Sequence, residues 1–482
     1  MGSDNTEDSP NEMFKFSLLG SAAAVLAPRL GRLAIAGRKP ISTPHYVPLT
    51  SRGMVPHLAH DVMRDSTAIG SLFMEKEQSA KKSSIPIPLY AVPTKPHESA
   101  LRKFTCLPDD ILLILGARRE PPIPCAPSNT PSSIAILTSV GFAQLSATQY
   151  AEATQKLSPD IVVGLSDLTI GQTPGIKRRA KMVDRTHAFT THGTEALLGP
   201  DLSEHSRSNA AYFAPILPLE NTEQQIYLED LETDLRPFIS GLALYEPASL
   251  SIVPEELGDL PRLLFSGPTT PHDILREVSL GADLLTLPFI SLASDTGVAF
   301  KFVFPAPTNE GTQHSSEPLP LADDLWSTSY TTDTAPLDKS CSCYTCQNHH
   351  RAYIHHLLSA KEMLAWTLLQ IHNHHVMDQF FAAIRESIER GTFKSDTQRF
   401  YKTYASEFPQ ATGEGPRLRG YKLPTSGPSQ PRRYPPAYGK LELAAEKYAE
   451  TTQADSSVAT PDTGADGLEE HGFAEKVRIS EK

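Results

Sequence analysis

Short apolar runs alternate with helical patterns between residues 14 and about 409. The apolar run at 262–267 is followed by an amphipathic stretch at 271–281 and then by a second apolar run, ADLLTL. Pro271 at the start and Gly281 at the end of the amphipathic stretch are typical of helix boundaries. Two apolar strands joined through a helix require a parallel sheet, so this part of the chain predicts a βαβ unit.

Further strand candidates occur at 134–137, 161–165, 238–244 and 298–304. For a region of roughly 390 residues, a TIM-type (β/α)8 barrel with insertions fits better than a small open sheet. The predicted fold class is therefore α/β, with the barrel domain at 14–410. Residues 305–340 are rich in Pro, Ser, Thr and Glu and lack periodicity, so we expect a surface excursion there.

The amino-acid composition is sufficient for a large folded core, and the net charge argues against one class of partner, nucleic acid held by bulk charge. The 482 residues carry 44 Lys and Arg against 56 Asp and Glu, a formal charge of −12, and 39% are hydrophobic. An acidic chain does not hold nucleic acid by bulk charge alone. The 41 prolines indicate long irregular stretches around the core.

The two ends of the chain predict polar tails. Residues 1–13 are polar and acidic, unlike a secretory or transit signal, and Gly2 with Thr6 matches only a loose myristoylation pattern. Residues 411–482 are Pro/Gly-rich and basic, then acidic, as in disordered tails. The apolar stretch at 14–27 is too short to span a bilayer and is interrupted by Lys15 and Ser17. We therefore expect no integral membrane segment and a cytoplasmic location.

Three of the five cysteines fall within six residues, at Cys341, Cys343 and Cys346. This clustering is unlike a dispersed disulfide framework. Three thiols on one loop can face a single soft, tetrahedral ion, so we predict one structural Zn²⁺ that needs one more ligand.

The fourth ligand is predicted from the histidines that follow the cysteines. A straight helix over 351–375 would carry its end roughly 35 Å away, so the chain must double back if a late histidine is the ligand. Ser359 and Glu362 match a capping box, which predicts a second helix and a helical hairpin. His372 then returns to the cysteines and is our candidate, with His349 and His350 as competitors from the local loop.

The cluster, Cys-x-Cys-x-x-Cys with His372 26 residues after the last Cys and followed by Asn373, resembles the zinc signature of the tRNA-guanine transglycosylases. The segments APRLGRLAIAGRKPISTPHYVPLTSRGMVPHL, SGLALYE and LPRLLFSGPTTPHDILREVSLGADLLT resemble other parts of that family. The resemblance covers roughly residues 24–405. It implies a (β/α)8 barrel with a zinc-binding helical subdomain, here 336–392, inserted near the C-terminal end of the barrel.

Catalytic members of the family exchange a guanine base in tRNA through one aspartate nucleophile and a second, assisting aspartate. The family pattern Asp-Met-Phe-Asp-Cys falls on residues 283–287, which puts Thr286 at the nucleophile position. Ser139 in TSVGFAQ stands at the position of the other aspartate. The chain also has Ser166 at a base-contacting aspartate and Tyr245 at a loop glycine, and Leu292 and Asp295 at arginines that read the anticodon loop.

An intact scaffold without the carboxylates resembles the family's non-catalytic members, which implies that this chain is not itself an enzyme. The implied partner is a catalytic subunit, in a heterodimer that exchanges guanine for queuine at wobble position 34 of tRNAs with GUN anticodons, those for Asp, Asn, His and Tyr. The resemblance also allows peripheral attachment to the mitochondrial outer membrane. Two alternatives remain: a divergent catalyst acting alone with Asp283 or Asp167 recruited, and a zinc-stabilised barrel with an unrelated binding role.

Two surfaces are candidates for contacts with these partners. The hairpin at 351–390 carries more large apolar side chains than one helical face can bury, so we expect the surplus to lie in the subunit interface. A basic run can contact tRNA phosphates, although a solvated helix face is the simpler interpretation. Its members are Lys177, Arg178, Arg179, Lys181 and Arg185.

Overall fold

The computed structural model describes most of the chain between residues 14 and 416. The described ranges are 14–20, 26–51, 53–75, 88–95, 98–125, 127–138, 141–203, 206–307, 317–413 and 415–416. The predicted tail at 1–13 and the part of the predicted tail 411–482 that follows residue 416 lie outside these ranges, and so does Ser139.

Eight parallel strands form a barrel, which confirms the predicted fold class. Their order in the sheet is β4-β13-β12-β11-β10-β9-β6-β5. A parallel bridge between Leu49 and Phe73 joins the two outer strands and closes the sheet. The strands are β4 (His45–Val47), β5 (Ser71–Glu75), β6 (Leu112–Gly116), β9 (Ile161–Val163), β10 (Ala211–Ile216), β11 (Gly241–Leu244), β12 (Arg262–Leu264) and β13 (Leu284–Thr286).

Both faces of the barrel strands are buried, as in strand β6. Leu112 and Ile114 pack inside the barrel in a cluster with Phe213. Leu113 and Leu115 point the other way and pack in a different cluster, against helices outside the barrel. Burial on both faces explains why these strands are continuous apolar runs rather than alternating ones.

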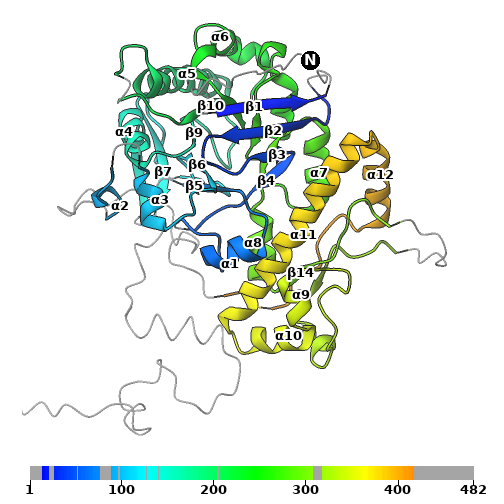
Figure 1. The fold of residues 1–482 in the computed structure, drawn as a ribbon. Coiled ribbons are helices and arrows are strands. Elements are labelled where there is room, and N and C mark those ends of the chain that lie inside the picture. The colour runs from blue at the N-terminus through cyan, green and yellow to red at the C-terminus, as the bar shows by residue number, and fades with distance from the viewer. Residues whose placement is uncertain are drawn as a thin grey trace, which may run out of the picture. The chain divides into compact units, whose positions relative to one another are not determined.

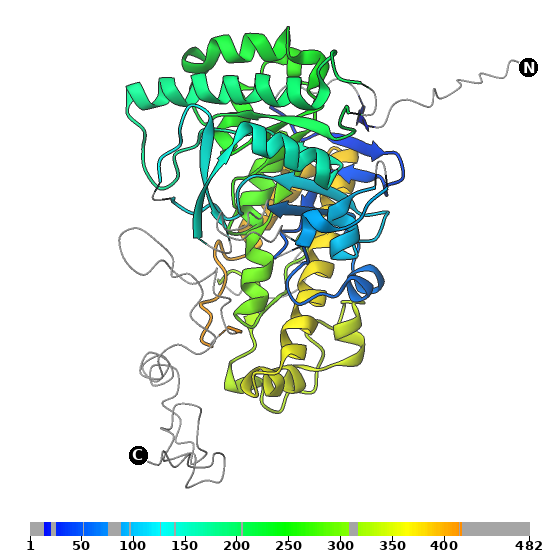
Figure 2. The ribbon, with the colours of Figure 1, turned by 90° about the vertical axis from the view of Figure 1, so that its left-hand side faces the viewer.

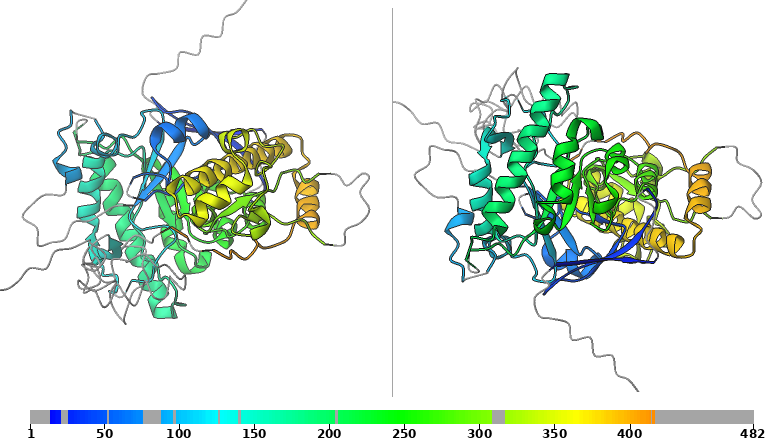
Figure 3. Two further views of the ribbon diagram at one scale, coloured as in Figure 1. Left: turned by 90° about the horizontal axis from the view of Figure 1, so that it is seen from below. Right: turned by 90° about the horizontal axis from the view of Figure 1, so that it is seen from above.

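Helices surround the barrel, and Figures 1 and 2 show α9 and α10 at the end of the molecule away from α5 and α6. In both views of Figure 3 the orange helix α12 lies on the opposite side from the teal helices α4 and α5. The helices are α1 (His60–Ser66), α2 (Pro88–Ala91), α3 (Ala100–Thr105), α4 (Ala147–Leu157), α5 (Ile176–Leu198), α6 (Asn221–Glu232), α7 (Pro271–Ser279), α8 (Pro288–Asp295), α9 (Tyr344–Asn348), α10 (Arg351–Ser359), α11 (Met363–Glu389) and α12 (Phe393–Thr403).

The βαβ unit predicted from residues 262–286 is confirmed. Helix α7 joins β12 to β13, and these two strands pair in parallel. Pro271 lies in the first turn of α7, and Thr270 with Asp273 forms a capping box that the sequence analysis missed. Proline and the cap fix the start of the helix, so a strand, a turn and a helix follow within a few residues.

Two of the predicted strands form but lie outside the barrel. Strand β7 (Ser133–Thr138) belongs to a two-stranded sheet with β8 (Gly141–Ser146). Strand β14 (Val298–Phe300) pairs antiparallel with β15 (Ala322–Asp324). The apolar pattern predicted the two strands correctly, but it does not indicate which strand each of them pairs with.

The N-terminal strands form a separate sheet at one end of the barrel. Strands β1 (Phe14–Leu19), β2 (Leu30–Ile35) and β3 (Ile41–Thr43) are antiparallel neighbours. No helix in the described part of the chain is long and apolar enough to cross a membrane.

Residues 317–340 are more ordered than the predicted surface excursion, since Leu321, Leu325 and Leu337 are buried. The folded body also extends past the predicted boundary at 410. Thr412 donates its hydroxyl to Asp324 at 2.6 Å, and a side chain at Gly413 would overlap the Trp326 ring.

The predicted helical hairpin forms, but the capping box predicted for it is wrong. Ser359 is the last residue of α10 and donates its hydroxyl to His355 O at 2.9 Å. Glu362 precedes α11 and makes no side-chain cap. Lys361 instead takes a positive φ of 55°, and backbone bonds to the end of α10 close the turn.

A buried ion pair ties the N-terminal segment to the barrel. Arg29 donates Nε to Asp283 Oδ1 at 3.0 Å and also binds the carbonyls of Gly258 and Leu260. Asp283 is fully buried and accepts a further bond from the backbone N–H of Arg262 at 2.8 Å. It precedes β13, so it lies at the amino ends of the barrel strands.

We predict that Asp283→Asn lowers the free energy of unfolding by about 3–5 kcal/mol, because it leaves the buried Arg29 guanidinium without its counter-charge. Denaturant unfolding followed by circular dichroism measures the change. The matched control is Asp65→Asn, since the Arg64–Asp65 pair is exposed and should contribute less than about 1 kcal/mol. Equal effects of the two substitutions would contradict the structural role of Asp283.

Candidate functional site

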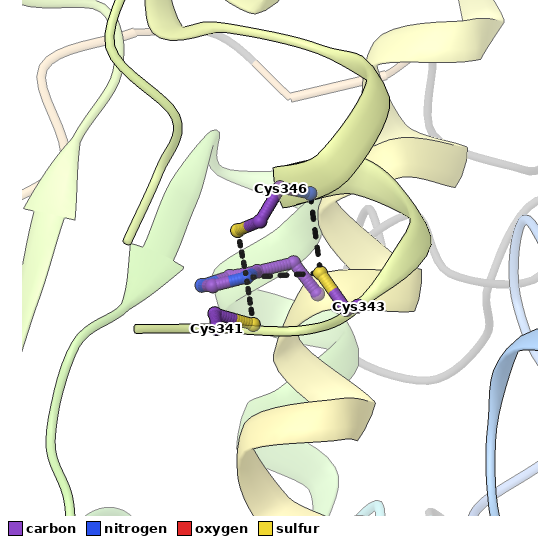
Figure 4. A group of neighbouring side chains, drawn as sticks. Cys341, Cys343 and Cys346 are labelled. Carbon is purple, nitrogen blue, oxygen red and sulfur yellow. Dashed lines mark hydrogen bonds between the residues drawn. The ribbon is translucent and has the colours of Figure 1, made fainter. Parts of the chain in front are cut away.

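The cysteine loop and helix α11 bring four potential metal ligands together. Cys341 and Cys343 precede α9, and Cys346 lies within it. Figure 4 shows the three thiols turned toward one another. One ligand atom each from these cysteines and from His372 lies within 4.8 Å of all the others. The structure therefore brings together the four residues that the sequence analysis selected.

The distances match a tetrahedral ion. The Sγ atoms of Cys341, Cys343 and Cys346 lie 3.7, 3.6 and 3.4 Å from His372 Nδ1. For a Zn–S bond of about 2.3 Å and a Zn–N bond of about 2.1 Å, the edge of a tetrahedron is about 3.6 Å. This donor set, three sulfurs and one imidazole nitrogen, fits zinc.

The second nitrogen of His372 fixes the orientation of the ring. His372 is fully buried, and its Nε2 lies 2.8 Å from Phe300 O. A carbonyl accepts from Nε2–H, so the lone pair belongs to Nδ1, which faces the thiols. Burial lowers the pKa of His372, but Cys341 and Cys343 raise it more, to about 10. The sulfurs therefore favour a positive charge beside Nδ1, and a metal ion bound there would take the place of the proton.

Asn373 supports the same centre through a structural role that was not predicted from the sequence. Its Oδ1 accepts from Phe300 N at 2.9 Å, and its Nδ2 donates to Val298 O at 3.0 Å and to Ser294 Oγ at 2.9 Å. Thus His372 and Asn373 bind both backbone groups of Phe300. In the sequence, the only indication of this role is that Asn373 directly follows His372.

The two competing histidines are engaged elsewhere. The His349 ring stacks on Tyr353, with centroids 5.6 Å apart. His350 caps α10, since its Nδ1 accepts from Tyr353 N at 3.2 Å. Neither belongs to the four-residue cluster found in the described part of the chain.

Thr286, at the position predicted for the nucleophile, offers no carboxylate. It is fully buried at the carboxyl end of β13, and its hydroxyl lies 3.4 Å from Leu264 O. Asp283 lies at the other end of that strand and is paired with Arg29. Asp283, the carboxylate nearest to Thr286 in the sequence, is therefore held in an ion pair.

Asp167 is also committed to ion pairs. It is fully buried and accepts from Arg178 Nη1 at 2.6 Å and from Arg185 Nη1 at 3.1 Å. Burial raises the pKa of Asp167, but its bonds to Arg178 and Asn129 lower the pKa below its ordinary value. An ionised aspartate held by two guanidinium groups is a poor base.

The other four positions at which the sequence departs from the family pattern have different surroundings. The Ser166 hydroxyl donates to Tyr245 OH at 3.1 Å, and the Tyr245 ring stacks on Phe265 with centroids 5.7 Å apart. Leu292 is exposed, and Asp295 lies 2.6 Å from His57 Nε2.

The basic run on α5 is largely occupied by acidic partners. Arg178 and Arg185 bind Asp167, and Arg179 pairs with Glu223 at 2.8 Å. Most of the run is therefore structural, which favours the simpler interpretation over a phosphate-binding surface.

The apolar surplus of the hairpin is mostly internal, which corrects the expectation of a broad exposed face. Exposed fractions reach 57% at Met363 and 42% at Leu364, both at the start of α11. The buried apolar side chains of the hairpin include Ile354, Leu357, Leu358, Trp366, Leu368, Leu369, Met377, Phe380 and Phe381. These side chains pack against the barrel and the cysteine loop rather than on a partner.

Comparison with known proteins shows similarity over most of the chain. The family model for queuine tRNA-ribosyltransferase matches residues 25–406. The chain is 33% identical to the queuine tRNA-ribosyltransferase accessory subunit 2 of Schizosaccharomyces pombe, over 85% of this chain and 89% of that protein. Proteins with the same name from Anopheles gambiae and Xenopus tropicalis are each 29% identical, over 78% and 75% of this chain and 87% and 94% of their own.

We predict one zinc per wild-type chain and a loss of nearly all of it in His372→Ala, because the substitution leaves three ligands and removes the bond to Phe300 O. Elemental analysis of the purified protein gives the ratio of metal to chain. His349→Ala is the control and should retain full zinc. The opposite result in the two variants would make His349 the fourth ligand.

Proposed function

The chain belongs to the queuine tRNA-ribosyltransferase family, the tRNA-guanine transglycosylases, and we propose that it is the non-catalytic subunit of a heterodimeric member. Its partner carries out the exchange of guanine for queuine at wobble position 34 of tRNAs with GUN anticodons, those for Asp, Asn, His and Tyr. The relatives of similar length that are named accessory subunits support this role.

The bonds made by two buried aspartates, Asp283 and Asp167, carry the proposal. A double displacement at the ribose needs one carboxylate as nucleophile and another as acid or base. Asp283 is paired with Arg29 at the amino ends of the strands, and Asp167 is bound by Arg178 and Arg185. These bonds weigh against the alternative that either aspartate was recruited for catalysis.

The metal in this proposal is one structural Zn²⁺, bound by Cys341, Cys343, Cys346 and His372. Zinc supplies a tetrahedral link that joins the cysteine loop to α11, and with four protein ligands it leaves no position for a reacting water. The role of the metal is therefore to hold the 336–392 subdomain on the barrel.

Membrane attachment and an unrelated binding role remain separate questions. Peripheral binding at the mitochondrial outer membrane stays a prediction of the family resemblance. A zinc-stabilised barrel without a tRNA partner would share the fold and the metal, so only an assay with the catalytic subunit separates it from the proposed role.

We predict that the chain alone does not exchange radiolabelled guanine into tRNA, because neither mouth position supplies a free carboxylate. The assay compares this chain, a catalytic subunit of the family, and the mixture of both. The mixture should be active and the isolated chain should stay at background. Turnover by the isolated chain at the rate of the mixture would contradict the proposal.

Restoring the aspartates gives a second arm of the same assay. Ser139→Asp with Thr286→Asp should not produce activity in the isolated chain, since Tyr245 still stacks over the mouth and Leu292 still replaces an arginine. Full activity of that double variant would mean that the rest of the catalytic site is intact.

We also predict that Met363→Asp with Leu364→Asp weakens pairing with the catalytic subunit by about tenfold or more, because it places charge in an exposed apolar patch. Acidic residues are tolerated in the first turn of a helix, so α11 should still form. Co-purification and zinc content are measured together. Ile226→Asp is the control: Ile226 is 72% exposed on α6, and its replacement should leave pairing unchanged. Intact pairing in the double variant would show that the subunit interface lies elsewhere on the chain.

A further inference from the structure

A cavity of about 190 Å³ remains at the carboxyl ends of the barrel strands. One wall is aromatic, with Phe73, Phe265 and Tyr245. Two side chains from the loop after β6, Arg118 and Glu120, line it as well. The mouth therefore combines an apolar wall with two groups that can ionise.

Arg118 lacks a counter-charge. Its Nη1 lies 3.4 Å from Ser166 Oγ, and its Nη2 is buried without a hydrogen-bond partner. No carboxylate among the described residues lies within 4.0 Å of it as an ion-pair partner. A buried guanidinium without a partner is costly, so the geometry points to an anion that enters the cavity.

Glu120 does not supply that anion near neutral pH. Its Oε2 is buried without a partner, and burial raises the pKa of the carboxyl group to about 8. The acid is therefore mostly protonated at pH 7 and can donate a hydrogen bond. The charged or titratable groups around it are Arg118 on its own loop, Glu75 at the end of β5, and Tyr245 and Glu246 after β11.

We propose that the barrel mouth binds a small monocarboxylate, whose carboxylate group accepts from Arg118 and whose apolar body lies against Phe73 and Phe265. A planar carboxylate matches the two donors of a guanidinium. One cation beside the acids Glu120 and Glu246 favours a single negative charge over a phosphate dianion. This site does not depend on the proposed role in base exchange.

The first test is calorimetric titration of the full-length, zinc-loaded chain at pH 7. The probes are benzoate, acetate, inorganic phosphate and the neutral isostere benzamide. Benzoate should bind most tightly, since it fills both parts of the cavity, and benzamide and phosphate should bind at least about tenfold more weakly. Failure of both benzoate and acetate to bind, or equal binding of benzamide, would overturn the proposal.

Substitutions locate the site. Arg118→Gln should abolish benzoate binding, and Arg64→Gln, which changes an exposed arginine, should leave it unchanged. The unfolding temperature without ligand shows whether each variant is folded. Benzoate binding that persists in folded Arg118→Gln would place the site elsewhere and contradict the proposal.

The pH dependence of benzoate binding tests the role of Glu120. Ionised Glu120 repels the ligand and pairs with Arg118, so benzoate affinity should fall about tenfold from pH 7 to pH 9 in the wild-type chain. Glu120→Gln should retain binding and remove this dependence. If Glu120→Gln instead abolishes binding, the carboxyl group itself holds the ligand and the assignment to Arg118 is wrong.

Discussion

His372 joins three parts of the molecule through its two ring nitrogens. Nδ1 faces the thiols of the cysteine loop, Nε2 donates to the backbone of β14, and the residue itself belongs to α11. Asn373 completes the connection, since it accepts from Phe300 N and donates to Val298 O of the same strand. Because metal-binding energy at such a centre is also folding energy, an ion held by these four residues would stabilise the subdomain on the barrel.

Two buried aspartates of the barrel, one at each end of its strands, are held in ion pairs. Asp283 fastens the N-terminal segment under the barrel, and Asp167 fastens α5 through two arginines. Tyr245 stacks on Phe265 and lines the cavity at the carboxyl ends of the strands. These contacts support our proposal that the chain keeps the scaffold of the family without the carboxylates that a glycosyl transfer needs.

The sequence predicted the barrel and the metal cluster because both depend on local patterns. The βαβ unit follows from apolar runs and helix caps, and the cysteine spacing limits the ion and its geometry. His372 was selected because the chain had to double back, although a left-handed Lys361 rather than a Ser359 cap makes the turn. Contacts between residues far apart in the sequence leave no local pattern from which they could be predicted. Arg29 and Asp283 are 254 positions apart, so only the structure identifies their pairing. The same holds for β14, whose partner strand β15 begins only at Ala322.

The central claim is that this chain supports base exchange without carrying it out. The most direct measurement uses the reconstituted heterodimer in which the nucleophilic aspartate of the catalytic subunit has been replaced by alanine, with pairing verified by size-exclusion chromatography. Exchange of radiolabelled guanine into tRNA is then measured. The account predicts background exchange, because Thr286, Asp167 and Asp283 cannot substitute for the missing nucleophile. Exchange that persists in that heterodimer and disappears with Asp167→Asn in this chain would contradict it.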